Sequence, residues 1–208
     1  MSNQQIVPAE SNLSNKLRII PLSGKPIYPG IITPLMLNSA TDLQVVEEAL
    51  ETDSLIGLVL VKDPENEQPV GSDLFKTGTV ARIIKKINLP DGGVNVIITT
   101  LKRFVIKKVI QAEHPITVAV DYKAEVLEDN PLFSEEMRLN MVNIDHPGKI
   151  ADFFASILNL DRKDQQKILD TFDIKVRMET VLVHIRKEQE LMKIQKKIRG
   201  QIEVKIEK

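Results

Sequence analysis

Short apolar, β-branched runs alternate with segments rich in glycine, proline and aspartate through the first 130 residues. Runs of this length, bounded by turn-forming residues, are typical of β-strands. The pattern predicts strands over residues 17–22, 31–37, 55–61, 79–89, 94–101, 104–110 and 116–120. Between two of them, the sequence PDGG at residues 90–93 predicts a hairpin turn, because Asp-Gly tolerates positive φ.

One helix interrupts these strands. Ser39 can cap it, with Asp42 three residues later, and Leu43, Val46 and Leu50 then repeat at spacings of three and four. Closely spaced strands with a single helix, and without a βαβ rhythm, predict a compact and mostly antiparallel sheet or barrel.

After residue 130 the spacing of apolar residues becomes helical. The sequence DHPG at residues 145–148 predicts a helix start, because proline is favoured at the first helical position. The apolar residues of this helix fall on one expected face: Ile150, Phe153, Phe154, Ile157 and Leu158. Asp161 and Asp173 predict the starts of two further helices.

The last helix is predicted to continue to the end of the chain. Its later part keeps only a narrow apolar stripe on a heavily charged background, formed by Leu191, Ile194, Ile198 and Ile202. Such a stripe is typical of a coiled coil and is too thin for the face of a globular core. The chain is therefore predicted to comprise a disordered leader (1–16), a β domain (17–129) and a helical domain (130–208).

Composition narrows the possible functions. The 208 residues include no cysteine, which excludes a disulfide scaffold, a thiol nucleophile and a cysteine zinc site. The net charge of −1 gives the molecule no overall electrostatic attraction to nucleic acid or to an anionic membrane. No apolar run reaches the roughly 18 residues of a membrane span, and the polar leader lacks the features of a signal or transit peptide. We therefore expect a cytoplasmic protein without membrane contact.

Motifs of catalysis are absent from the sequence. There is no phosphate-binding loop, no Gly-x-Ser-x-Gly turn and no HExxH, and the three histidines, His114, His146 and His184, are scattered singly. We predict no catalytic, nucleotide-binding or metal site. Basic pairs at residues 85–86, 102–103 and 107–108 lack interleaved aromatic residues, which favours solvated strand edges over a nucleic-acid surface.

Several motifs together resemble the N-terminal region of Lon-type ATP-dependent proteases, and they follow that family's order over residues 17–208. They are IPL, IYPG and TPL within residues 20–35, GTVARI at 78–83 with LPDG at 89–92, LKRF at 101–104, NIDHPGKIAD at 143–152 and QKKIR at 195–199. The chain departs from the family pattern at Thr100, where glycine is usual, and at His146, which lies between the motif's aspartate and proline.

The resemblance implies an α+β fold, in which a PUA-like β domain precedes a helical bundle that ends in a long connecting helix. It implies a non-catalytic region for substrate recognition and assembly in an ATP-dependent serine protease that degrades misfolded, damaged and short-lived regulatory proteins. The implied partners are unfolded or damaged proteins and the other subunits of a homohexamer. ATP and magnesium would serve the parent protease, with no cofactor in this fragment, and the short leader fits a bacterial protein.

Substrate contacts are expected at apolar residues in predicted loops or where such a loop meets a predicted strand. These are Ile27, Tyr28, Ile31, Leu74 and Phe75. Two other functions remain open: a free-standing adaptor with a Lon-like domain and, with less support, a PUA-like RNA-binding protein.

The junction near Asp129-Asn130 is shorter than the resemblance implies. The family would have another helix there, whereas in this chain Ser134 can cap only a short one. We predict that residues are missing at this point. A Cα separation far above the roughly 3.8 Å of a trans peptide bond would reveal the gap.

Overall fold

The computed structural model describes residues 13–37, 39–89, 94–125 and 146–206, with the backbone alone described over 200–206. The chain divides into two compact units, Met1–Ala124 and Glu125–Lys208. The predicted 90–93 turn, the 129–130 boundary with its proposed gap, the helix after Ser134 and most of the predicted leader lie outside the described residues.

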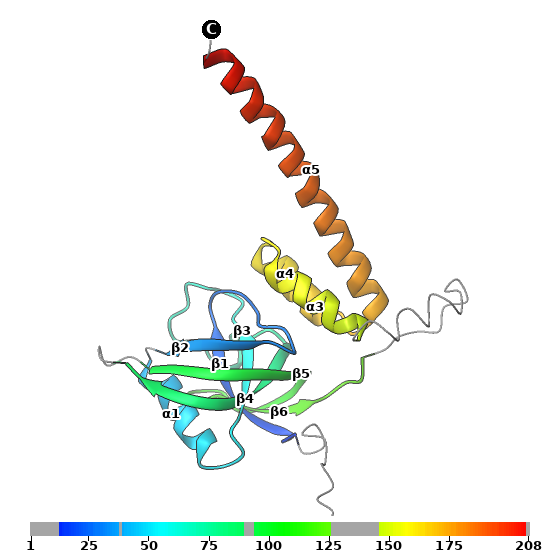
Figure 1. The fold of residues 1–208 in the computed structure, drawn as a ribbon. Helices are drawn as coiled ribbons and strands as arrows, with labels where there is room; N and C mark the ends of the chain where they lie inside the picture. Colours follow the sequence, from blue (N-terminus) through cyan, green and yellow to red (C-terminus); the bar gives the residue numbers. More distant parts are fainter. Residues whose placement is uncertain (1–12, 38, 90–93, 126–145, 207–208) are drawn as a thin grey trace, which may run out of the picture. The chain divides into compact units, whose positions relative to one another are not determined.

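The first unit is built from one six-stranded mixed sheet (Figure 1). Its strands are β1 (Lys16–Leu22), β2 (Ile32–Leu37), β3 (Leu55–Leu60), β4 (Thr77–Asn88), β5 (Val94–Gln111) and β6 (Thr117–Asp121). The strand order is β2-β5-β4-β3-β1-β6, and β6 pairs back onto β5. This last pairing closes five strands into a barrel and leaves β2 attached outside it. Only β1 and β3 pair in parallel, as expected for a mostly antiparallel domain.

β5 corrects one sequence prediction, because the strands expected at 94–101 and 104–110 form a single 18-residue strand. The basic pair Lys102-Arg103 suggested an interruption, but Arg103 is only 1% exposed and continues the pairing with β4. β5 pairs with β2 through its first half and with β6 through its second half. Shifts in register at Ile83/Lys85 and Ile106/Lys108 mark bulges, which allow long strands to bend around a barrel.

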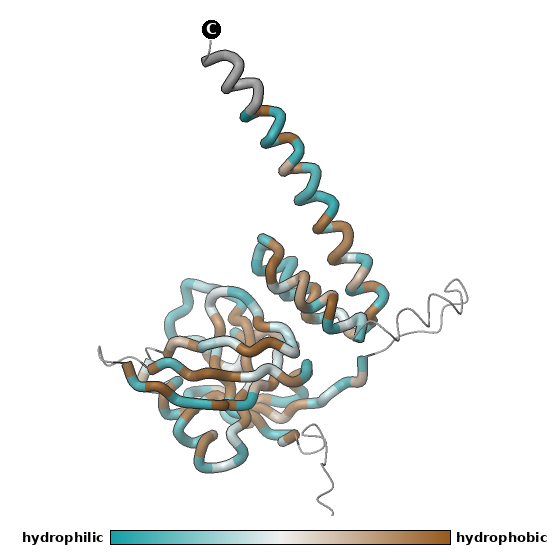
Figure 2. The backbone as a smooth tube through the Cα atoms, viewed as in Figure 1, coloured by the Kyte–Doolittle hydropathy of each residue, from teal (hydrophilic) through white to brown (hydrophobic). Residues whose placement is uncertain are grey.

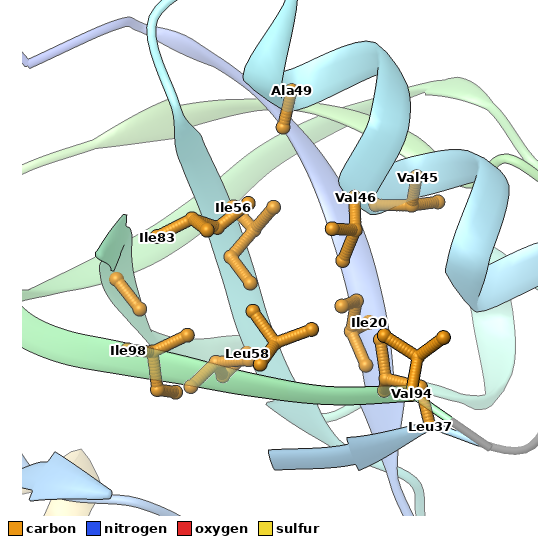
Figure 3. Close-up of a cluster of buried hydrophobic side chains, with 12 residues drawn as sticks. Ile20, Leu37, Val45, Val46, Ala49, Ile56, Leu58, Ile83, Val94 and Ile98 are labelled. Carbon is orange, nitrogen blue, oxygen red and sulfur yellow. The ribbon is translucent and has the colours of Figure 1, made fainter. Parts of the chain in front are cut away.

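Helix α1 (Ala40–Leu50) covers one end of the barrel core. The predicted cap is confirmed: the Ser39 hydroxyl accepts a hydrogen bond from the Thr41 backbone N–H at 3.2 Å. Val45, Val46 and Ala49 are fully buried, and they pack with aliphatic side chains of the strands (Figure 3). Burial of an aliphatic side chain contributes roughly 1.5–3 kcal/mol, so α1 is held by its packing.

Gly78 lets two parts of the barrel wall approach closely. A Cβ atom at this position would lie 2.5 Å from the Leu58 carbonyl oxygen and 2.8 Å from the Phe104 ring. Both neighbours are buried, and the nearer atom belongs to the backbone. The GTVARI segment therefore begins with glycine for a steric reason.

The second unit contains three described helices, α3 (Pro147–Ile157), α4 (Arg162–Asp170) and α5 (Ile174–Ile206). The predicted starts are confirmed, because the Asp161 side chain accepts from the Asp164 N–H at 2.8 Å and Asp173 accepts from the Val176 N–H at 3.0 Å. α5 runs for 33 residues. Figure 2 shows it as largely hydrophilic, with scattered hydrophobic positions. The predicted α+β class is therefore confirmed.

Candidate binding surface

The structure separates the five predicted contact residues into two groups. Tyr28 is 0% exposed and Leu74 is 3% exposed, so both are core residues, which corrects the prediction that they contact a ligand. Ile27, Ile31 and Phe75 are half-buried. Ile27 packs against the core beneath α1, and Phe75 packs against the core at the other part of the barrel.

Tyr28 is buried because the segment that carries it pairs with β5. The Gly30 N–H donates to the Thr100 carbonyl at 3.0 Å, and the Thr100 N–H donates to the Ile31 carbonyl at 2.9 Å. Gly30 has a φ of +82°, a conformation that glycine adopts readily and that turns the chain into β2. The IYPG segment, which the sequence places in a loop, therefore lies against the sheet.

The two most exposed large apolar residues of the described β unit lie on β2. Successive side chains of a strand point to opposite faces. Leu35 and Leu37 face the core, whereas Ile32, Pro34 and Met36 face outward. Ile32 is 69% exposed and Met36 is 65% exposed.

This outward face continues across β5 onto β4 through the strand register. Met36 lies opposite Asn95, and Asn95 lies opposite Ile87, which is 37% exposed. The bulge of β4 leaves Ile84 without a register partner and 55% exposed. We call the resulting patch the outer sheet surface; its residues are Ile32, Pro34, Met36, Ile84, Ile87 and Ile97. A single exposed aliphatic residue needs no explanation, but a contiguous group indicates a binding site.

The charged residues within the three strands of the outer sheet surface are all positive. β2, β4 and β5 contain no Asp or Glu. Arg82 and Lys85 lie opposite Thr99 and Ile97, on the same outward side. The next residue, Lys86, instead forms an ion pair with Glu47 of α1 at 2.7 Å. The surface thus combines aliphatic side chains of β2 and β4 with Ile97 and the polar Asn95 and Thr99 of β5, and with two cations of β4.

A second apolar patch lies on α3 of the helical unit. Phe153 is 57% exposed, Phe154 39% and Ile157 60%, and the two rings make an edge-to-face contact with centroids 5.9 Å apart. The sequence places these three residues on one apolar face of the helix, and the structure leaves all three exposed. α3 instead buries small residues and one carboxylate: Gly148, Ala151, Asp152 and Ala155.

Arg177 of α5 explains why α3 packs by this small-residue face. Its guanidinium is fully buried and lies 3.4 Å from Asp152 and 3.1 Å from Glu125. It also donates to the Thr171 carbonyl at 3.1 Å. A Cβ on Gly148 would come within 2.6 Å of this guanidinium. Pairing a buried cation takes precedence over burying two phenylalanines, since an unpaired buried charge is very costly.

The described part of the chain contains no cluster of possible metal ligands. No group of three His, Cys, Asp or Glu side chains in these ranges could hold a metal ion. Burial raises the pKa of Asp42, although the nearby charge of His114 opposes this shift. Burial, and then the charge of Asp53, raises the pKa of Tyr122 to about 12. Neither residue belongs to the outer sheet surface. Both pKa shifts arise mainly from burial of the side chain and do not mark the candidate site.

Two cavities lie away from the outer sheet surface. One of about 400 Å³ in the helical unit is lined by residues of the α3–α4 turn, α4 and α5, including His184. Another of about 370 Å³ lies beside the Arg18–Glu48 ion pair of the β unit. Across the helices that the structure describes, none is long and apolar enough to cross a membrane.

Most of the chain matches the model of one known protein family. Residues 16–187 match the model of the ATP-dependent protease La (LON) substrate-binding domain. The chain is 48% identical to the Lon protease of Treponema pallidum (strain Nichols), over 98% of this chain and 25% of that protein. It is 38% identical to the Lon protease of Leptospira interrogans, over 100% of this chain and 27% of that protein. The chain thus spans about a quarter of the length of these relatives.

The alignments with these two relatives extend over 225 and 230 positions, more than the 208 residues of this chain. Both relatives therefore carry residues that this chain lacks within the aligned region. The alignments do not place the difference at the 129–130 junction, so the gap there stays a prediction.

Two solved structures share the fold. One is the Lon N-terminal domain protein from Xanthomonas campestris, with a TM-score of 0.61 and 20% identity, over 81% of this chain and 97% of that one. The other is the N-terminal domain of Mycobacterium avium complex Lon protease, with a TM-score of 0.59, 16% identity and the same coverage.

Proposed function

This chain belongs to the Lon substrate-binding domain family, and we propose on that premise that its outer sheet surface receives exposed apolar segments of unfolded or damaged proteins. The proposal rests on one observation. Ile32 and Met36 of β2 and Ile84 and Ile87 of β4 are exposed aliphatic residues on one outward face of the sheet, on either side of β5. Native proteins bury such side chains, so a surface of this kind distinguishes unfolded chains from folded ones.

The size of this surface favours weak binding. Burial of an exposed aliphatic side chain contributes roughly 1.5–3 kcal/mol, and association and the ordering of the ligand cost several kcal/mol. A handful of such contacts therefore gives affinities on the order of micromolar. Weak binding suits a receptor that must release its substrate to a later step. Several copies in one assembly would raise the overall affinity by avidity.

The remaining roles follow from the family premise and are part of the proposal. The parent would be a bacterial, cytoplasmic, homohexameric serine endopeptidase that uses ATP and magnesium in modules outside this chain. This chain would contribute recognition of misfolded, damaged and short-lived regulatory proteins and would support assembly. A free-standing adaptor would use the same surface, so the binding experiment applies to both.

RNA binding is the alternative that the positive charge of β2, β4 and β5 would support. Single-stranded RNA is usually held by bases stacked on exposed aromatic rings. Phe104, the one aromatic residue of these three strands, is 0% exposed. The outer sheet surface is therefore better suited to aliphatic side chains than to bases.

The test measures binding of one labelled model protein, in a permanently unfolded form and in its native form, by fluorescence anisotropy. We expect this chain, without substitutions, to bind the unfolded model protein more tightly than the native one. Ile32→Asp and Met36→Asp should each weaken binding of the unfolded protein at least fivefold. The matched control is Ile110→Asp, which places the same charge at a 50% exposed isoleucine outside the outer sheet surface. Equal binding by all these proteins would contradict the proposal. Tyr28→Asp is expected to unfold the β unit, because Tyr28 is a core residue.

A further inference from the structure

β2 differs from the other strands in its neighbours. Each of the five barrel strands is paired on both sides, because β6 returns to β5. β2 pairs only with β5, so among the described residues its other edge has no partner strand. An exposed edge presents backbone donors and acceptors that can template another strand.

The register identifies the backbone groups on this edge. In an antiparallel pair, hydrogen-bonded and non-hydrogen-bonded residue pairs alternate. The Thr100 N–H bonds to the Ile31 carbonyl, so the next residue, Ile32, directs its N–H and C=O away from β5, as do Pro34 and Met36. Proline has no N–H to offer a neighbouring strand, which fits this position. The free edge therefore carries two donors and three acceptors.

One of these acceptors has a weak local contact. The Pro34 carbonyl lies 3.4 Å from the hydroxyl of Thr33, at the limit of a hydrogen bond. This contact leaves a second lone pair for a ligand, since a carbonyl oxygen accepts two hydrogen bonds.

We propose that an extended polypeptide segment binds as an added strand along the free edge of β2. This inference rests on the proposed function and specifies how the segment is held: by its backbone at the edge, and by alternate side chains beside Ile32 and Met36 on the outer sheet surface. Backbone pairing does not depend on sequence, so it suits a receptor for many substrates. It also requires an extended, unpaired backbone, which folded proteins rarely expose.

Charge decides the chemistry of the occupant. β2, β4 and β5 contain no carboxylate, and Arg82 and Lys85 face outward beside the apolar residues. A second copy of this chain would bring the same positive surface to the edge. A segment with apolar residues at alternate positions and Asp or Glu at its ends would complement both the aliphatic side chains and the two cations.

Pro34 gives a test that changes one backbone donor on the edge. Its outward position allows Pro34→Val to supply the missing N–H without a change of face. One added hydrogen bond should tighten binding of an extended peptide about three- to tenfold. Pro34 also protects the edge against self-pairing, so the oligomeric state of the variant must be measured with the affinity.

The decisive experiment uses peptides with alternating valine, acidic ends and N-methyl groups on either the odd or the even residues. The two series have identical side chains. Because alternate residues of a strand direct their N–H groups to opposite sides, methylation blocks the N–H groups that face β2 in one series and those that face solvent in the other, for either strand direction. We expect one series to bind the full chain like the unmethylated peptide, and the other at least tenfold more weakly, by fluorescence anisotropy.

The outcomes separate the two proposals. Equal binding of both series, together with weakened binding of unfolded protein by Ile32→Asp, would overturn strand addition and leave the proposed function standing. No effect of Ile32→Asp on unfolded protein would count against the proposed function itself. Dimerisation of Pro34→Val without tighter peptide binding would overturn the inference in favour of a second copy as the occupant.

Discussion

The hydroxyl of Thr100 donates a hydrogen bond to the carbonyl of Tyr28, 2.7 Å away and 72 residues earlier in the chain. The same oxygen accepts a bond from the Ile31 N–H at 2.8 Å. One side chain of β5 thus satisfies two backbone groups of the segment that leads into β2.

Thr100→Val should destabilise the β unit, because it removes the hydroxyl while keeping the shape of the side chain. It removes the hydrogen bonds of that hydroxyl to the Tyr28 carbonyl and the Ile31 N–H, at a cost of roughly 1–3 kcal/mol. Urea unfolding followed by circular dichroism measures the change. Thr99→Val is the control, since its side chain faces outward on the same strand, and its effect should stay within about 0.5 kcal/mol.

Gly78→Ala should also destabilise the β unit, through overlap with a neighbouring backbone. The new methyl would meet the Leu58 carbonyl oxygen at 2.5 Å, and forced overpacking of this kind costs roughly 1–3 kcal/mol. At Gly24 a Cβ would meet no atom within 4 Å. The matched Gly24→Ala variant should therefore be neutral or slightly stabilising by thermal unfolding. Equal effects of the two changes would show that the barrel adapts at Gly78.

Arg177→Met should destabilise the helical unit strongly. Asp152 is 2% exposed and would lose its cationic partner, which costs roughly 3–5 kcal/mol. Arg186→Met changes an exposed arginine of the same helix and should have little effect. The double change Arg177→Met with Asp152→Leu should recover part of the loss in chemical denaturation. Failure of the double variant to recover would indicate that Arg177 acts mainly through its other contacts.

Tyr122 should titrate well above a free tyrosine. Its pKa is raised to about 12, and its hydroxyl donates to the Ser14 carbonyl at 2.7 Å. The folded state favours the neutral phenol, so this stabilising contribution is complete below the unfolded pKa of roughly 10 and is lost as pH rises toward 12. The difference in phenolate absorbance between the native chain and Tyr122→Phe should have its midpoint near pH 12. A midpoint near 10 would show that the ring is solvated.

The sequence predicted the order and type of the elements because their signals are local. Alternating β-branched runs mark the strands, and Ser39, Asp161 and Asp173 supply caps that any helix start requires. β5 was predicted as two strands because Lys102-Arg103 interrupts its apolar pattern. Arg103 is buried through tertiary contacts, which periodicity cannot register.

The binding residues were harder to predict, because exposure depends on partners far away in the chain. Tyr28 lies in a sequence that reads as a loop, yet the distant Thr100 ties it to the sheet. Ile32 and Met36 read as ordinary strand residues, and only the position of β2 outside the barrel leaves them exposed. Similarly, Phe153 and Phe154 follow a core-like pattern, but the buried Arg177 turns α3 onto its small residues.

The first part of α5 contains buried residues, and its later part, as far as Arg199, contains none. Ile174, Arg177 and Val181 are buried, whereas no residue from Leu182 to Arg199 is. At 1.5 Å per residue the helix is about 50 Å long, and from Gln189 to Arg199 every residue is exposed. Isolated helix of this kind is marginal in water. Amide protons beyond Val181 should therefore exchange with solvent progressively faster along the chain, and the helix should act as a firm rod only where another surface packs against it.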